Sequence, residues 1–417
     1  MKDTIITGLD IGSTSIRAVV GQMFSDGGEK KLQIIGAAEH PSEGVSRGTI
    51  ASLDSAIGAI TACLEKAERM TGIPVDAAWV GISGTHIVSQ ASKGVVAIGR
   101  VNGEISRQDV ERAVEAARAI ATPANYEILH VIPRGAVIDG QIAIKDPIGM
   151  TGTRLEMDTL IIQGFASEIR NFTKCIYRTG MEIDDLVFSI LATADAVLSN
   201  KQKDLGTILV NIGGATTSII VFEEGEVLHT VILPVGADHI TCDIAIGLRV
   251  SIDVAEKIKR DYGSLSPLTE GGKKADVNLS DFDSLEDGTI SLKYVSHIIE
   301  ARVEEIFEKI HLELKKIGRD GMLPGGVVLT GGGSKLHGMV DTAKKRLKLP
   351  ASIATVRNVV NPIEKVFDQS FTTAVSLCYW GLSSIQQKQK HQNFPFKMDT
   401  SFDAKGRVKK WFKSLLP

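Results

Sequence analysis

Two short polar turns, each set between apolar strands, contain residue types that bind phosphate. In the first, Asp10 and Gly12 precede the hydroxyl residues Ser13-Thr14-Ser15, and apolar residues stand on both sides. A hairpin tip that gathers backbone N–H groups is an anion site, and a carboxylate just before it could hold a metal ion through water. An ordinary β-hairpin with a polar turn would give the same local pattern, because short glycine motifs often match by chance.

The same pattern recurs in the second half of the chain. An apolar strand enters the turn Asn211-Ile212-Gly213-Gly214-Ala215-Thr216-Thr217, and a second apolar strand leaves it. A third turn, Gly331-Gly332-Gly333, follows the apolar run 327–330 and is expected to open a helix over 336–347, with its N-terminal N–H groups facing an anion. Two such hairpins and a late glycine turn together predict a phosphate compound held between two similar halves.

These residues resemble the actin/Hsp70/sugar-kinase superfamily, in which two lobes clamp ATP between their hairpins. The resemblance implies an α/β fold, the two-lobed actin-like (ribonuclease H-like) ATPase fold, with ATP and Mg²⁺ as cofactors. Asp10 would serve the Mg²⁺ through water, and Arg17 matches the position of a phosphate-contacting lysine in actin. The phosphates would contact Ser13, Thr14, Ser15, Gly213, Gly214, Thr216 and Thr217, and the adenosine would lie against Gly331, Gly332 and Gly333. Gly12, Asn211 and Lys335 belong to the same expected nucleotide site.

A predicted helix over 251–262 places Glu256, Lys259 and Arg260 on one face, at spacings of three and four residues. A solvated charged face is the more common outcome for such a triplet. In Hsp70-like relatives, however, a matching Glu-x-x-Lys-Arg helix holds the adenine and ribose, so the resemblance implies that Glu256 and Lys259 contact the nucleotide. Gly236, at the turn that opens the preceding predicted helix, completes the expected site.

Length and composition limit the class of protein. A chain of 417 residues is long for one core, so two to four domains are expected. A net charge of −3 is too balanced to suggest nucleic-acid binding, and the four cysteines are far apart, which fits a reducing cytosol. Met1-Lys2-Asp3 runs directly into the first predicted strand, so we expect no signal peptide. The chain also lacks an apolar run of about 18 residues that could span a membrane.

A block of strands around a helix over 106–120 interrupts the first lobe and is interpreted as an inserted β–α–β subdomain. Expected strands lie at 87–101, as a strand–turn–strand, and at 126–132, 134–138 and 159–165. An insertion at this place resembles the FtsA family, the actin-like bacterial cell-division proteins, and the resemblance covers essentially the whole chain. The matching runs are Val45-Ser46-Arg47-Gly48-Thr49-Ile50, Gly81-Ile82-Ser83-Gly84-Thr85-His86-Ile87, His130-Val131-Ile132-Pro133, Asp146-Pro147-Ile148-Gly149-Met150-Thr151-Gly152 and Thr372-Thr373-Ala374-Val375.

Membership of that family implies an ATP-binding protein that polymerises and tethers the division ring of the tubulin-like FtsZ to the cytoplasmic face of the bacterial membrane. It implies as partners the FtsZ C-terminal tail, further copies of the chain, the anionic membrane surface and, through the inserted subdomain, later division proteins. Arg302, on a long amphipathic helix expected over 295–317, lies where relatives receive the FtsZ tail, although an exposed arginine is usually just solvated.

The expected domain organisation follows the lobes, each with a core and an outer part. We expect the first-lobe core at 1–84 with a return at 354–385, the inserted subdomain at 85–163, the second-lobe core at 164–230 and 321–353, its outer subdomain at 231–320, a flexible linker at 386–405 and a membrane-binding helix at 406–417.

The last twelve residues have the pattern of a helix that lies in a membrane interface. Apolar side chains recur at helical spacing, basic residues take most of the remaining surface, and a polar Gln/Lys-rich stretch precedes them. A helix that docks on its own domain is the alternative. The residues expected to bind membrane are Val408, Lys409, Lys410, Trp411, Phe412, Lys413, Leu415 and Leu416.

The second hairpin departs from its superfamily at one position that matters for hydrolysis. It usually begins Asp-x-Gly, whereas here it begins with Asn211, which cannot serve as a carboxylate for metal-bound or attacking water. We therefore expect ATP binding with at most slow hydrolysis, and Asp195 and Asp238 are the candidates for a base. Two alternatives stay open: an FtsA-like pilus-assembly scaffold and a sugar-kinase-type phosphotransferase.

Overall fold

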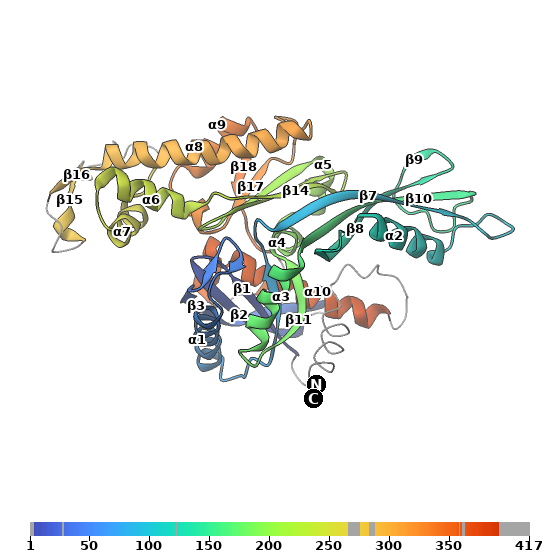
Figure 1. Ribbon diagram of the computed structural model, residues 1–417, viewed down its shortest axis with the longest axis horizontal. Coiled ribbons are helices and arrows are strands. Elements are labelled where there is room, and N and C mark those ends of the chain that lie inside the picture. Colours follow the sequence, from blue (N-terminus) through green and yellow to red (C-terminus); the bar gives the residue numbers. More distant parts are fainter. Residues whose placement is uncertain are drawn as a thin grey trace.

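The computed structural model confirms a two-lobed α/β architecture with an arm extending from one side (Figure 1). The structure describes residues 4–26, 29–121, 123–265, 276–282, 288–357, 359–360 and 363–391. The linker beyond residue 391 and the membrane-binding helix at 406–417 lie outside these residues. Both expectations therefore stay predictions.

The first lobe is built on a six-stranded sheet in the order β11-β6-β1-β2-β3-β19. The first predicted hairpin is confirmed: β1 and β2 pair antiparallel, and their register places Asp10 opposite Arg17. Next to it β3 continues the meander and places Glu39 opposite Arg17. The strands are β1 (Thr4–Ile11), β2 (Ser15–Asp26), β3 (Glu29–Pro41), β6 (Ala77–Ile82), β11 (Glu182–Phe188) and β19 (Val359–Val360), with the short pair β4 (Val45–Ser46) and β5 (Thr49–Ile50) beside them.

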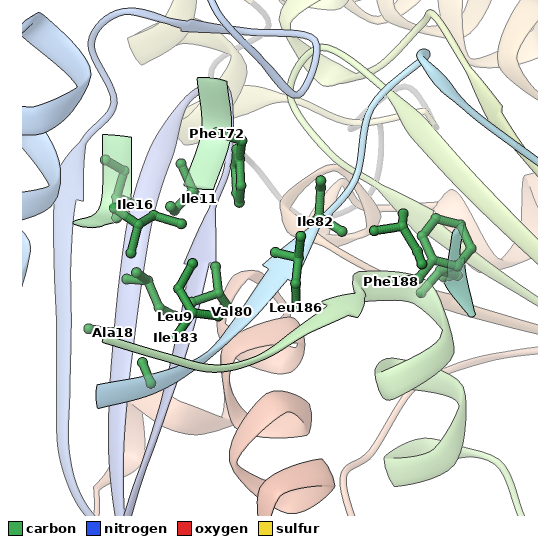
Figure 2. Packing of buried hydrophobic residues seen from close by; sticks show 14 of the residues in the cluster. Leu9, Ile11, Ile16, Ala18, Val80, Ile82, Phe172, Ile183, Leu186 and Phe188 are labelled. Carbon is green, nitrogen blue, oxygen red and sulfur yellow. The ribbon is translucent and has the colours of Figure 1, made fainter. Parts of the chain in front are cut away.

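Helices cover both faces of this sheet. Leu9, Ile16 and Val80 point to the face covered by α1 (Leu53–Thr71) and α3 (Ala166–Tyr177), in one buried cluster (Figure 2). Because alternate residues of a strand point to opposite faces, Ile6 and Val19 belong to a second cluster on the other face, under α10 (Thr372–His391). Apolar residues at helical spacing, such as Ile60 and Leu64, give α1 the buried face that packs on the sheet.

The second lobe repeats the plan on a five-stranded sheet, in the order β14-β13-β12-β17-β18. Its hairpin pairs Ile212 with Thr217 across the predicted glycine turn, which confirms the second strand–turn–strand motif. The strands are β12 (Thr207–Ile212), β13 (Thr217–Glu223), β14 (Glu226–Leu233), β17 (Val327–Thr330) and β18 (Ala351–Ile353); the helices α4 (Ser189–Val197) and α5 (Asn200–Leu205) precede them, and α9 (Met339–Leu347) lies between β17 and β18.

The arm is a four-stranded antiparallel sheet in the order β7-β10-β8-β9, with the predicted helix α2 (Arg107–Ala121) packed on it. Three local predictions were wrong. The stretch 87–101 forms one strand, β7 (Ile87–Ala97), and the two strands predicted on either side of Pro133 form one irregular strand, β8 (Tyr126–Ile138). The strand β9 (Gln141–Ile144) was not predicted, and β10 (Arg154–Phe165) begins earlier than expected.

The arm also covers the edge strand of the second lobe, β14. The Ser89 hydroxyl donates to the Thr230 carbonyl at 2.9 Å, Arg134 donates to the Leu228 carbonyl at 3.4 Å, and Lys145 Nζ donates to the Glu224 carbonyl at 2.8 Å. An edge strand presents unpaired carbonyls that favour aggregation unless they are covered. Side chains of the arm therefore provide hydrogen bonds to carbonyl groups at this edge of the second lobe.

The outer part of the second lobe consists of α6 (Ala237–Leu248), α7 (Ile252–Tyr262) and the long α8 (Leu292–Lys316), with a small pair of strands, β15 (Asp276–Asn278) and β16 (Thr289–Ser291). Of the two residues that could cap the helix predicted over 251–262, Ser251 and Asp253, Ser251 is the N-cap: its hydroxyl accepts from the Val254 N–H at 3.3 Å. These helices pack through one buried cluster that includes Ile244, Ile258 and Ile306.

The C-terminal end of the described chain corrects one boundary. The stretch from Gln386 was interpreted as linker, but α10 continues through His391. Helix propensity explains the difference, because Gln, Lys and His residues need no apolar periodicity to extend a helix that is already anchored. Among the described residues, none of the helices combines the length and the apolar character needed to cross a bilayer.

His130 provides a test of how the arm is attached to the first lobe. It is buried, its Nε2 accepts from the Phe188 N–H at 2.9 Å, and its ring packs edge-on to Trp380 with 6.2 Å between centroids. We predict that His130→Ala lowers the free energy of unfolding by about 3 kcal/mol, because it leaves a cavity and an unpaired N–H. Denaturant unfolding monitored by tryptophan fluorescence measures this change.

Arg154→Ala is the matched control within the arm. Arg154 is exposed and forms an ion pair with Glu156 at 2.9 Å, so its loss should change stability by less than about 0.5 kcal/mol. Equal effects of the two substitutions would contradict the anchoring role of His130.

Candidate functional site

A cleft of about 800 Å³ lies between the lobes and collects the predicted residues from distant parts of the sequence. It is lined by both hairpin turns, by α6 and α7, by the glycine turn after β17 and by the segment that leads into α10. All but two of the predicted nucleotide residues line it: Asp10, Gly12, Ser13, Thr14, Ser15, Arg17, Asn211, Gly213, Gly214, Thr216, Glu256, Lys259, Gly331, Gly332, Gly333 and Lys335.

Thr217 and Gly236 are the two that do not line the cleft. Thr217 is fully buried, and its hydroxyl donates to the Val235 carbonyl at 2.8 Å. Gly236 packs against the second hairpin, where a β-carbon would come within 2.3 Å of the Gly214 carbonyl oxygen. Both residues therefore support the second hairpin without lining the cleft.

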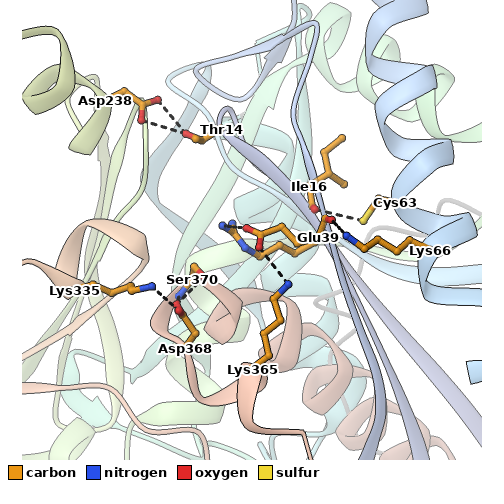
Figure 3. Close-up of polar contacts among 11 residues, drawn as sticks. Thr14, Ile16, Glu39, Cys63, Lys66, Asp238, Lys335, Lys365, Asp368 and Ser370 are labelled. Atoms are coloured by element: carbon orange, nitrogen blue, oxygen red, sulfur yellow. Dashed lines mark hydrogen bonds and ion pairs between the residues drawn. The ribbon is translucent and has the colours of Figure 1, made fainter. Parts of the chain in front are cut away.

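The tips of the two halves meet at Thr14. The Thr14 hydroxyl donates to the Asp238 carboxylate at 3.0 Å, from the first hairpin to the first turn of α6 (Figure 3). Gly214 lies directly beneath this contact: a β-carbon there would be 1.9 Å from the Thr14 oxygen and 2.6 Å from Asp238. A β-carbon at this position would therefore displace the contact, because real β-carbons do not approach other heavy atoms within 3 Å.

The second hairpin is docked on the N-terminus of α6. The Ala237 and Asp238 N–H groups donate to the Gly213 and Gly214 carbonyls, at 2.8 and 2.9 Å. These N–H groups would otherwise be orphan donors of the helix. They hold the hairpin in place, so these two N–H groups are not available to an anion in the cleft.

Asp10 is the strongest candidate for a metal ligand. Desolvation by burial raises its pKa from an ordinary 3.8 to about 6, although the nearby Arg17 charge lowers it. The part of the chain that the structure describes holds no cluster of three or more His, Cys, Asp or Glu side chains suited to a metal. Mg²⁺ needs no such cluster, because it is commonly bound by one carboxylate together with waters and substrate phosphates. Asp10 therefore fits Mg²⁺ brought in with a nucleotide.

Arg17 is fixed by its neighbours in the cleft. Its guanidinium donates to Glu39 at 2.7 Å and lies over the Phe371 ring, 5.5 Å from the centroid. Lys365 completes the group through Glu39 at 3.5 Å and through the same ring at 5.2 Å (Figure 3). Burial raises the pKa of Glu39, but the charges and hydrogen bonds of Arg17 and Lys365 outweigh it, so the pKa lies below its ordinary value.

On α7, the predicted pair Glu256 and Lys259 is turned toward α6. Lys259 is buried, and its ammonium group has acceptors in the Ala237 carbonyl at 3.3 Å, the Thr241 hydroxyl at 2.7 Å and the Glu256 carboxylate. A lysine has three protons to donate, so these contacts engage them all. Lys259 thus joins α7 to α6 at the wall of the cleft, and Arg260 beside it lines the cleft as well.

The glycine turn after β17 depends on a positive φ. Gly331 has a φ of 85°, and a β-carbon there would be 2.3 Å from the Asn211 side-chain oxygen. The expected direct opening of a helix at this turn is wrong: residues Gly332–Lys335 form a 3₁₀ turn, and α9 begins only at Met339. Lys335 forms an ion pair with Asp368, in the segment before α10.

Asn211 forms a hydrogen bond between the lobes. Its amide donates to the Thr373 hydroxyl at 3.1 Å and so ties the second hairpin to α10. Of the two candidate bases, Asp238 lines the cleft, whereas Asp195 on α4 pairs with Lys203 at 3.4 Å and does not line it. Arg302 lies away from the cleft on α8 and forms a bidentate ion pair with Asp243, at 2.6 and 2.8 Å.

Sequence reasoning missed the segment before α10 as part of the site. Glu364–Phe367 and Gln369–Phe371 are 3₁₀ turns that bring Lys365, Asp368 and Phe371 to the cleft. The segment has no glycine or hydroxyl motif of its own. The nearby run 372–375, noted only as part of a family resemblance, was the signal that could have pointed to it.

The fold and the cleft place the protein in a class: two-lobed, actin-like proteins with an insertion in the first lobe. Among solved structures, the chain is similar to one of the PilM–PilN type IV pilus biogenesis complex, with a TM-score of 0.66 and 16% identity over 90% of this chain and 98% of that one. It is also similar to MreB5 of Spiroplasma citri bound to ADP, with a TM-score of 0.54 and 12% identity over 93% and 98%. At such identities these structures show the fold alone.

Sequence comparison gives the family. The chain is 36% identical to the cell division protein FtsA of Pseudomonas aeruginosa over 91% of this chain and 89% of that protein, and 36% identical to that of Bacillus subtilis over 90% and 83%. A family model described as cell division protein FtsA matches residues 208–376, and a model described as the SHS2 domain inserted in FtsA matches residues 84–163. The chain belongs to the FtsA family of cell division proteins.

The raised pKa of Asp10 predicts opposite effects of one substitution on stability and on binding. Between about pH 4 and 6 the folded protein keeps the Asp10 proton that the unfolded chain has lost, so this contribution to stability is lost as the pH rises through 6. Asp10→Asn should therefore stabilise the protein at pH 7 by up to about 3 kcal/mol and leave it unchanged below pH 4. Its Mg²⁺-dependent nucleotide affinity should fall at least tenfold.

Denaturant unfolding at several pH values and calorimetric titration with Mg²⁺–ATP measure the two effects. Asp253→Asn, at the exposed start of α7 on the rim of the same cleft, is the control for removing a negative charge. An Asp10→Asn variant that is less stable than the unaltered protein at pH 7 would contradict the desolvated carboxylate.

Proposed function

We propose that the protein binds ATP with Mg²⁺ between its two hairpins and, as a polymer, tethers the cell-division ring to the cytoplasmic face of the bacterial membrane. The observation that carries the nucleotide part is the cleft, in which hydroxyl and glycine turns from both lobes face each other across one space. Asp10 would hold the Mg²⁺, the hairpins the phosphates, and the wall formed by α7 and the glycine turn the adenosine. The nucleotides named for two of the similar structures, ADP and AMPPNP, agree with this assignment.

The C-terminal sequence supports the membrane part. Four basic residues near an anionic surface contribute about 1 kcal/mol each, and insertion of the apolar face adds several more. Ordering a short helix offsets part of this gain, since such a segment is coil in water. One copy should therefore bind weakly and reversibly, whereas a polymer of many copies binds firmly through avidity.

The proposed partners follow from family membership. The outer part of the second lobe would receive the FtsZ C-terminal tail, and the arm would contact later division proteins. Arg302 is a candidate docking residue, but its bidentate bond with Asp243 gives it a structural role as well. Copies of the chain itself would form the polymer.

Nucleotide would act mainly in assembly, with slow turnover at most. Asn211 stands where a carboxylate would activate water, and its amide is already bonded to Thr373. A sugar-kinase-type phosphotransferase would need a base and a polar substrate pocket, and the membrane-type tail offers it no advantage. A pilus-assembly scaffold shares the fold, but the tail and the family assignment favour the division protein.

The Asn211 hypothesis predicts that a carboxylate at this position raises ATP hydrolysis. Asn211→Asp keeps the bond to Thr373, because a threonine hydroxyl can donate as well as accept. Turnover should rise at least tenfold over the unaltered protein, as measured by phosphate release. Asn211→Ala, which lacks both the amide and a carboxylate, should show no rise. Unaltered protein that turns over at kinase-like rates of about 1–100 per second would overturn the hypothesis.

The tethering proposal predicts ATP-dependent co-sedimentation with anionic liposomes. The full chain should bind, more strongly with ATP and at higher protein concentration, whereas a chain that ends at Asn393 should stay in solution. Neutral liposomes are the control for the electrostatic attraction between the basic residues and anionic lipid, and binding to them should be weaker. Equal binding of the truncated chain, or no binding by either, would show that the tail is not a membrane anchor.

A further inference from the structure

The hydrogen bond between Thr14 and Asp238 is a direct contact between the two halves of the nucleotide site (Figure 3). Thr14 lies at the tip of the first hairpin, and Asp238 belongs to the second lobe. Gly214, at the tip of the second hairpin, fills the space beneath them with no room for a side chain. The two hairpin tips therefore touch at this point, in addition to the bond that ties Asn211 to Thr373.

The contact determines what Thr14 can offer a phosphate. A threonine hydroxyl has one proton, and the structure directs it to the Asp238 oxygens at 3.0 and 3.3 Å. The side chain is thus occupied as a donor, and only the backbone N–H of Thr14 remains for an anion.

Asp238 is held firmly from its own side. Its N–H donates to the Gly214 carbonyl at 2.9 Å, and the neighbouring Ala237 carbonyl accepts from Lys259 at 3.3 Å. Lys259 is buried and also bonds Thr241 on α6. The backbone of Asp238 is therefore fixed on the second lobe, and its carboxylate extends from there to the first hairpin.

The charge of Asp238 is not what the contact requires. A carboxylate beside a phosphate site would repel an anion, and the N-terminus of α6 offsets that charge only in part. An amide oxygen accepts a hydroxyl proton equally well in geometry. The contact requires only a hydrogen-bond acceptor at position 238 and a hydroxyl group at position 14.

We propose that Asp238 is a positioning residue, which acts through Thr14 to set the spacing of the two hairpins that the terminal phosphate of ATP requires. This inference rests on the proposed ATP site. The adenosine wall lies on the second lobe, so a looser first hairpin weakens contacts with the terminal phosphate more than contacts with the rest of the nucleotide. The spacing thereby sets the preference for ATP over ADP.

The test is calorimetric titration of the full-length protein with Mg²⁺–ADP and with a Mg²⁺ complex of a non-hydrolysable ATP analogue. Thr14→Val and Asp238→Ala should each weaken binding of the ATP analogue about tenfold, as expected for loss of one hydrogen bond, and leave the affinity for ADP within twofold. The double variant should be no weaker than either single one, because both remove the same contact.

Thr14→Ser and Asp238→Asn are the matched controls, since each keeps the bond; neither should weaken binding of the ATP analogue relative to ADP. If Asp238→Asn weakens binding of the ATP analogue as much as Asp238→Ala does, the contact depends on the negative charge of Asp238, and the inference is wrong. Unchanged affinity ratios in Thr14→Val and Asp238→Ala also overturn it while leaving the ATP site intact. Failure of the unaltered protein to bind either nucleotide would overturn the proposed function itself.

Discussion

The close approach of two backbone hairpins is the constraint on which the nucleotide cleft depends. Gly213 and Gly214 give their carbonyls to the first N–H groups of α6, and Thr14 reaches across to Asp238 from the other lobe. A side chain at Gly214 would meet the Thr14 hydroxyl and the Asp238 carboxylate and so displace this contact. The same few residues thus hold each hairpin and join the lobes, which explains why small and hydroxyl residues are concentrated at the tips.

Charges around the cleft are arranged in pairs that largely cancel. Arg17 and Lys365 share Glu39, Lys335 pairs with Asp368, and Lys259 pairs with Glu256. Such pairing orients long side chains without making the cleft strongly positive. Asp10 differs from these paired carboxylates, because desolvation raises its pKa. A divalent cation that arrives with the phosphates would remove that penalty, so the cleft is better suited to a metal–nucleotide complex than to a free anion.

The sequence predicted the elements that contain strong local signals and missed those that depend on distant contacts. Both hairpins, α1, α2 and α7 follow from apolar periodicity, turn glycines and caps, and most of the cleft-lining residues follow from the hairpins. The segment with Lys365 and Phe371 reaches the cleft only because β19 returns the chain to the first lobe, which no local pattern encodes. Likewise, the late start of α9 at Met339 reflects the 3₁₀ turn that Gly331 imposes.

The arm connects the two lobes at a second place, far along the chain from the hairpins. It is inserted between β6 and β11 of the first lobe, and His130 fixes it there through Phe188. Ser89, Arg134 and Lys145 nevertheless donate to carbonyls of the second lobe. Leu228 and Thr230 lie two residues apart on β14, so their carbonyls point to the same edge of the strand, whereas Glu224 lies in the turn before it. The arm is therefore bonded to both lobes, and a change in the placement of one lobe against the other would break or exchange these hydrogen bonds.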